Sequence, residues 1–141
     1  MFDKTTDDLR QELMTASDLD TYLTENRDQF AQRGFGELLN RLIARKRLSK
    51  AALARESGMS EVYLYQMLSG RRKPSRDRLL CLCVGLGADA EEVRELLTTA
   101  TCAQLYPRDR RDAIILHGIL HHTPLGEIND RLFDANEKTL F

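Results

Sequence analysis

The sequence has no tryptophan, only three prolines and three cysteines among its 141 residues, and few runs of Val, Ile or Thr. Leu, Ala, Arg and Glu dominate instead, which favours helix over strand and predicts an all-α chain. The cysteines are Cys81, Cys83 and Cys102. Cys81 and Cys83 lie two residues apart and therefore point apart on a helix, so we expect ordinary thiols rather than a metal site or a redox switch.

Long apolar runs are also absent. No stretch approaches the roughly 18 apolar residues that a membrane-spanning helix needs. The first ten residues, MFDKTTDDLR, are acidic and contain no apolar core of a secretory signal. These two observations predict a cytoplasmic protein with no membrane partner.

The sequence has little net charge, but its charges are unevenly placed. Residues 41–78 carry 11 Lys or Arg against three acids, a net charge of +8. Residues 1–32 carry eight acids against three bases, and residues 79–141 carry ten against six. A basic middle between acidic flanks is typical of a phosphate-facing patch, although a solvated helix surface has the same composition.

Apolar spacing and start signals predict a series of helices. Two weaker patterns in residues 1–33 begin at Thr5 and Ser17 and form a docking arm or an added layer on the core. Further helices are predicted over residues 35–47, 49–57, 60–69, 75–86, 88–99, 107–122 and 125–135, with an extended tail at 135–141. The residues expected to face the core include Leu53, Ala54, Met59, Leu64, Met67, Ile114, Ile115, Ile119, Leu120, Ile128, Leu132 and Phe133.

The run from Leu48 to Pro74 contains two short helical patterns joined by a turn at Gly58, and a basic cluster follows at once. It resembles the helix-turn-helix of lambda-repressor-like, XRE-type regulators. The matching residues are Leu48-Ser49-Lys50, Leu53-Ala54, Gly58-Met59-Ser60, Leu64, Met67 and Gly70-Arg71-Arg72-Lys73-Pro74.

This resemblance covers about residues 35–99 and implies a compact helix-turn-helix bundle with additional N-terminal and C-terminal helices. It divides the chain into an N-terminal helical extension at 1–33, a DNA-binding domain at 34–100 and a C-terminal helical pair at 101–141. Double-stranded DNA is the implied partner, bound by a homodimer that reads half-sites about 10 base pairs apart. We expect the C-terminal helices to mediate dimerisation or to contact a protein partner.

The second helix of the motif, at about 60–69, is the one expected to enter the major groove. The residues predicted to contact bases are Glu61, Val62, Tyr65 and Gln66. A glutamine pairs bidentately with adenine, and an apolar side chain contacts the thymine methyl. The residues predicted to contact phosphates are Lys50, Ser60, Tyr63, Ser69, Arg71, Arg72 and Lys73.

This helix differs from an ordinary DNA-reading helix. Glu61 is acidic, and Val62, Tyr63 and Tyr65 make the outward face apolar and aromatic. Exposed aromatic residues favour protein interfaces. The alternative function is therefore an interaction adaptor that docks a protein partner through this face.

Motifs for other chemistry are missing. The sequence contains no nucleophile elbow, phosphate loop or set of metal ligands, so we predict neither enzyme activity nor a cofactor. His117 and His121 share a helix face but have no further ligands, and they suit a helix C-terminus better than a metal. The polar run from Tyr106 to Asp112 indicates either a capped helix start with local Arg/Asp pairs or a partner contact.

Overall fold

The computed structural model describes residues 4–25 and 31–141, and over these residues the secondary structure is entirely helical, as predicted. The helices are α1 (Thr6–Thr15), α2 (Leu19–Glu25), α3 (Ala31–Lys46), α4 (Lys50–Glu56), α5 (Glu61–Leu68), α6 (Arg76–Leu86), α7 (Ala90–Thr99), α8 (Arg110–Leu120) and α9 (Leu125–Asp134). Residues 1–3 and 26–30, which belong to the predicted N-terminal extension, lie outside the described residues. No helix in the described ranges is both long and apolar enough to cross a bilayer.

Side-chain caps explain where most of these helices begin. Ser49, Ser60 and Ser75 each accept a hydrogen bond from the backbone N–H three residues later, which satisfies one free donor of the first turn. Two predicted starts were wrong. Helix α2 begins after Asp18, whose carboxylate accepts from the Asp20 N–H, and Ser17 takes no part. Helix α8 begins at Arg110 rather than Pro107, because Asp109 caps the N–H of Asp112.

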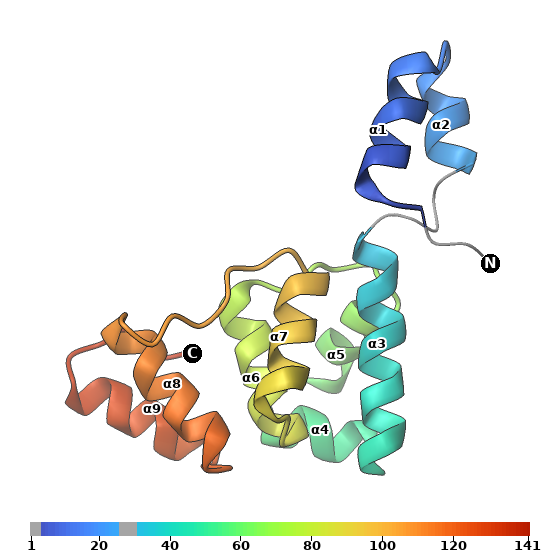
Figure 1. Ribbon diagram of the computed structural model, residues 1–141. Helices are drawn as coiled ribbons and strands as arrows, with labels where there is room; N and C mark the ends of the chain where they lie inside the picture. The colour runs from blue at the N-terminus through green and yellow to red at the C-terminus, as the bar shows by residue number, and fades with distance from the viewer. Residues whose placement is uncertain (1–3, 26–30) are drawn as a thin grey trace.

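Helices α3 to α7 enclose the main core (Figure 1). In the helix-turn-helix, Leu53, Ala54, Leu64 and Met67 are buried as predicted, and Met59 is partly buried against them. Helix α4 packs on α5 and α6, while α3 packs on α5 and α7. This arrangement holds α5 on its inner side and leaves its outer side at the surface.

Helices α8 and α9 pack against each other and against α6. Their buried residues include Ile115, Ile119, Ile128 and Leu132. The prediction that Leu120 and Phe133 also face the core was wrong, because their side chains are 54% and 74% exposed. Each directly follows a buried residue, and a step of one residue turns a side chain about 100° around the helix.

The two ends of the chain are held differently. Residues 137–141 lie outside any helix, yet Leu140 is buried and its N–H donates to Asn129 Oδ1 at 2.7 Å. Helices α1 and α2 form a hairpin beyond the beginning of α3 (Figure 1), and neither contains a buried residue. The C-terminal segment is therefore part of the packed body, whereas the N-terminal hairpin adds no layer to the core.

The crossing of α4 and α6 leaves no room for a side chain at Gly85. A Cβ there would overlap the hydroxyl of Ser57, which is itself fully buried. We expect Gly85→Ala to lower the free energy of unfolding by about 1–3 kcal/mol, the usual cost of overpacking a core. Chemical denaturation measures this. The matched control is Gly126→Ala in α9, where no neighbouring atom lies within 4 Å of the added Cβ. That control should raise stability by up to about 1 kcal/mol, and an equal loss in both variants would contradict the argument.

Candidate nucleic-acid interface

The turn between α4 and α5 sets the direction of α5. Gly58 has φ +65°, in the left-handed region that costs glycine little. The chain then reverses through Met59, and the Ser60 hydroxyl accepts from the Tyr63 N–H at 3.1 Å to start α5. With Leu64 and Met67 buried, the opposite side of α5 is presented outward.

The residues predicted to contact bases lie on this outward side. Glu61, Val62 and Tyr65 are exposed and Gln66 is half-buried. The two apolar members stand well out of the surface, since Val62 is 67% and Tyr65 is 51% exposed. Helix α5 therefore offers an open, partly apolar face flanked by the polar ends of Glu61 and Gln66.

Lys50 extends this face onto α4. Its Nζ lies 5.1 Å from the centre of the Tyr65 ring, a cation–π distance. Lys50 is the first residue of α4, so the contact joins the beginning of α4 to the middle of α5. A residue predicted to contact phosphate and one predicted to contact a base are thus brought together.

Tyr63 occupies a different place from Tyr65. It is half-buried, and the Arg72 and Arg78 guanidinium carbons lie 5.2 and 5.8 Å from its ring centre. The ring thus joins the loop after α5 to the first turn of α6. The sequence reasoning missed Arg78. Its only signal was its place within the basic segment 41–78, because the stacking partner is distant in sequence.

The basic loop, residues 70–75, follows α5. Gly70 has φ +80°, and the Arg72 N–H donates to the Gln66 carbonyl at 3.2 Å, which ties the loop to the end of α5. The side chains of Arg71, Arg72 and Lys73 are exposed. Lys73 Nζ donates to Thr101 Oγ1 at 3.1 Å, beside a shallow pocket of about 250 Å³ between this loop and the end of α7.

The two serines predicted to contact phosphate differ in whether their hydroxyl hydrogen is already used in a hydrogen bond. Ser60 uses an oxygen lone pair as the cap, so its hydroxyl hydrogen is free to be donated. The Ser69 hydroxyl already donates to the Gln66 carbonyl at 3.1 Å. Ser69 would have to give up that bond to donate to a phosphate.

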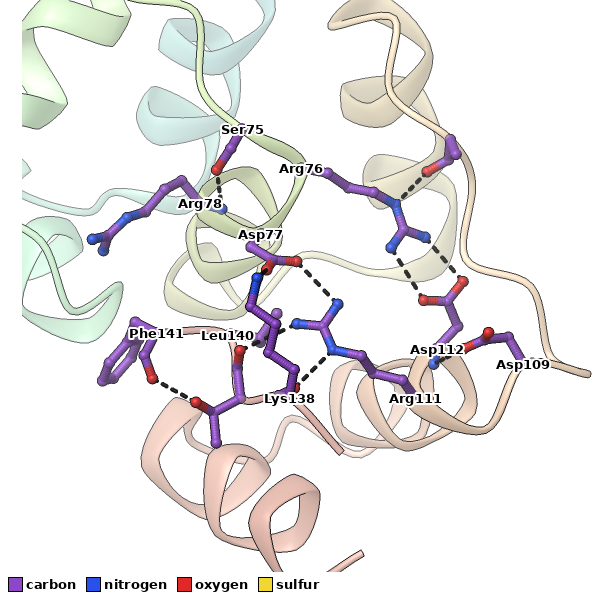
Figure 2. Close-up of polar contacts among 12 residues, drawn as sticks. Ser75, Arg76, Asp77, Arg78, Asp109, Arg111, Asp112, Lys138, Leu140 and Phe141 are labelled. Carbon is purple, nitrogen blue, oxygen red and sulfur yellow. Dashed lines mark hydrogen bonds and ion pairs between the residues drawn. The ribbon is translucent and has the colours of Figure 1, made fainter. Parts of the chain in front are cut away.

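Several other cations of the basic segment serve the fold instead. Arg45 and Lys46 pair with Glu92 at 3.4 and 3.0 Å. Arg76 donates two hydrogen bonds to Asp112, at 3.1 and 3.0 Å. Figure 2 shows Arg76 and Arg78 leaving α6 in different directions, with Arg76 turned toward Asp112. Two arginines that lie two residues apart on α6 therefore have different roles.

A second ion pair crosses between α6 and α8 beside the first. Arg111 donates to Asp77 at 3.1 Å, and its guanidinium also binds the carbonyls of Lys138 and Thr139 (Figure 2). The expectation of local Arg/Asp pairs in the run Tyr106–Asp112 was therefore wrong for these two residues. Arg111 and Asp112 reach α6 instead and fix the C-terminal helices to the helix-turn-helix.

Burial and charge act in opposite directions on Asp112. Burial alone would raise the pKa of its carboxyl group. Hydrogen bonds from Arg76 and from the Tyr106 N–H, with the charges of Arg76 and Arg111, outweigh burial and hold the pKa below its ordinary value. Asp112 is therefore a charged partner in this crossing at neutral pH.

The buried cysteines Cys81 and Cys83 are unreactive thiols. Burial raises the pKa of Cys81 to about 11 and that of Cys83 to about 12, so both remain thiols at neutral pH. The rings of His117 and His121 lie 4.2 Å apart. Within residues 4–25 and 31–141, no three His, Cys, Asp or Glu side chains are grouped as metal ligands.

Comparison with known proteins identifies a family for the central part of the chain. Residues 35–96 match a protein-family model described as a helix-turn-helix domain. No curated protein matches the chain, and no solved structure does. The match runs from Phe35 in α3 to Leu96 in α7 and agrees with the resemblance to XRE-type regulators over about 35–99.

Proposed function

Because residues 35–96 form a helix-turn-helix domain, a fold that indicates DNA binding, we propose that the protein is a sequence-specific transcriptional regulator that places α5 in the major groove of DNA. The observation that carries this proposal is the surface around α5. Its outward side is open, and exposed or half-buried cations border it from α4 and from the basic loop.

The roles divide by position. Glu61 and Val62 in the first turn of α5, with Tyr65 and Gln66 one turn later, face the base edges. Lys50, Ser60 and the basic loop bind the phosphates on either side, which sets the register without reading sequence. We propose a homodimer as the DNA-bound form, with residues 101–141 carrying the subunit contact or receiving a signal.

Arg78 joins the phosphate-binding group in this proposal. The Tyr63 ring holds Arg72 and Arg78 close together, so two guanidinium groups from the loop and from α6 present charge at one place. Arg78 is half-buried and no carboxylate pairs with it among the described residues, in contrast to Arg76. Tyr63 is then a positioning residue rather than a separate phosphate contact.

The alternative is an adaptor that binds a protein through the same face. The exposed side chains of Val62 and Tyr65 favour it, because apolar and aromatic residues are enriched where protein partners dock. The two functions differ in their response to DNA sequence. Selection of bound DNA from a random pool should return a common motif for a regulator, whereas an adaptor should return none.

Single substitutions separate base reading from phosphate binding. We expect Gln66→Ala to relax preference at one base position by about 1–3 kcal/mol, since only that pair loses its hydrogen bonds. Arg72→Ala should weaken all sequences alike. Quantitative binding to a panel of single-base operator variants measures both. If Gln66→Ala changes no position or Arg72→Ala changes specificity, the assigned roles are wrong.

A further inference from the structure

The turn between α4 and α5 is covered by two side chains from the C-terminal part of the chain. A Cβ placed on Gly58 would lie 3.0 Å from Phe141 Cε1 and 3.4 Å from Leu125 Cδ2. The ring and the leucine therefore fill the space in which a side chain of residue 58 would stand. This contact joins the centre of the helix-turn-helix to α9 and to the segment that follows it.

The backbone next to Phe141 is held in place, although the Phe141 ring is 60% exposed. Leu140 is buried, and its N–H donates to Asn129 Oδ1 at 2.7 Å. The Arg111 guanidinium donates to the carbonyls of residues 138–139 at 2.7 and 3.2 Å (Figure 2). The segment before the ring is therefore fixed to α8 and α9, which limits how far the ring moves from Gly58.

The turn gains from such a support because its own backbone is adaptable. Gly58 has φ +65°, and glycine reaches both halves of the φ range at low cost. The N–H groups of Gly58 and Met59 donate to carbonyls of α4 at 3.2 and 3.0 Å. These bonds tie the turn to α4 rather than to α5. Side chains packed beside Gly58 restrict the backbone rotation that sets the direction of α5.

The direction of α5 matters most for the residues at its beginning. Leu64 and Met67 are buried and hold the middle and end of the helix, whereas Glu61 and Val62 follow the turn. A helix of eight residues is about 12 Å long, so a tilt of about 10° moves one end by about 2 Å relative to the other. Such a shift breaks a hydrogen bond to a base, since N–H···O lengths span only about 2.7–3.2 Å.

We propose that Phe141 is a positioning residue for base reading. Its ring, packed beside Gly58, holds the turn and thereby fixes the first turn of α5 against the base edges, and Leu125 supports the same turn from the beginning of α9. The effect on base reading rests on the proposed function, but the restraint of the turn does not. The C-terminal region thus acts on the reading helix within one subunit.

Hydrogen exchange tests the restraint without DNA. We expect Phe141→Ala to speed exchange of the Gly58 and Met59 amides at least about tenfold, because the turn then opens more readily. The Arg72 amide, which bonds a carbonyl at the other end of α5, should exchange at the wild-type rate. The control is Tyr106→Ala, which removes a ring of similar exposure, 58%, before α8. It should leave the exchange of the turn unchanged.

Base discrimination is the readout that a merely structural role would not move. It is the ratio of the affinity for a sequence selected from a random pool to the affinity for an unrelated duplex. Phe141→Ala should lower this ratio at least about fivefold, the lower end of couplings between distinct sites. The slope of log affinity against log salt concentration should not change, because the phosphate contacts remain. Loss of a subunit contact would instead reduce that slope.

Gly58→Ala identifies the ring as the cause, because the added methyl group presses on it. The combined loss of discrimination in the Gly58→Ala, Phe141→Ala double variant should be at least about twofold smaller than the product of the two single losses. The matched control is Gly87→Ala. Gly87 has φ +63°, close to that of Gly58, but no neighbouring atom lies within 4 Å of an added Cβ. Its effects on discrimination and on the denaturation midpoint should be the same with and without the ring.

The proposal is overturned if Phe141→Ala leaves the exchange of the turn or the discrimination at the wild-type value, or if the salt slope falls together with the discrimination. It is also overturned if Tyr106→Ala speeds the exchange equally, or if the losses from Gly58→Ala and Phe141→Ala multiply. Faster exchange in Phe141→Ala, with a wild type that selects no DNA motif, leaves the restraint standing and contradicts the proposed function. A selected motif with unchanged exchange has the opposite meaning.

Discussion

Replacing Arg71, Arg72 and Lys73 together by alanine is expected to lower the affinity for every DNA sequence on the order of 100-fold at 0.15 M salt. Each phosphate contact releases counterions and contributes about 0.9 to the slope of log affinity against log salt concentration. Three lost contacts should therefore reduce that slope by about 2.7. Fluorescence anisotropy titrations over a range of salt concentrations measure the affinity and the slope together.

The control for this triple variant must remove the same charge elsewhere. Arg94, Arg108 and Arg131 are exposed and lie on α7, before α8 and on α9. Their combined replacement by alanine should change the slope far less. Equal slopes for the wild type and the Arg71/Arg72/Lys73 variant would remove the basic loop from the interface and favour the adaptor function.

Asp112→Ala is expected to lower the free energy of unfolding by about 3 kcal/mol, because it leaves a partly buried guanidinium without its partner. Asp112 is 8% exposed and accepts two hydrogen bonds from Arg76 and one from the Tyr106 N–H. Chemical denaturation measures the loss. Asp130→Ala, at an exposed position of α9, should cost little, and a similar loss in both variants would contradict the assignment.

The same residue predicts a pH dependence. Since the pKa of Asp112 is lowered in the folded protein, its contribution is fully present above the unfolded-state pKa of about 4. That contribution is lost as the pH falls through the lower, folded-state value. The difference in stability between the wild type and Asp112→Ala should therefore be constant at neutral pH and shrink under acid conditions. A difference that grows on acidification would reverse the expected sign.

Local signals explain why the helices of residues 35–99 could be predicted from the sequence. Ser49, Ser60 and Ser75 each cap a helix through an interaction that spans three residues. When two apolar residues are adjacent, the sequence does not show which of them faces the core. In Ile119-Leu120 and Leu132-Phe133 the spacing allows either member to face inward, and only the packing of α8 on α9 decides.

The candidate site was predictable in composition but not in arrangement. The spacing of Val62, Tyr65 and Gln66 placed them on one side of a helix, as the structure does. The sequence gives no comparable signal for contacts between different helices. Arg76 and Asp112 are 36 residues apart, and the stacking of Arg78 on Tyr63 depends on how α6 meets α5. No periodicity in the sequence encodes these distances.

The ion pairs described above reduce the area of positive electrostatic potential that an approaching polyanion meets. Residues 41–78 carry 11 Lys or Arg, but Arg45 and Lys46 share Glu92, and Arg76 pairs with Asp112, so two acids outside that segment offset two of these three charges. At a distance beyond the Debye length of about 8 Å, such close pairs contribute little attraction. Long-range attraction therefore originates in a smaller area than the sequence suggests, centred on the loop after α5. Diffusing DNA would be steered first to the phosphate-binding edge, and the base-reading helix would follow.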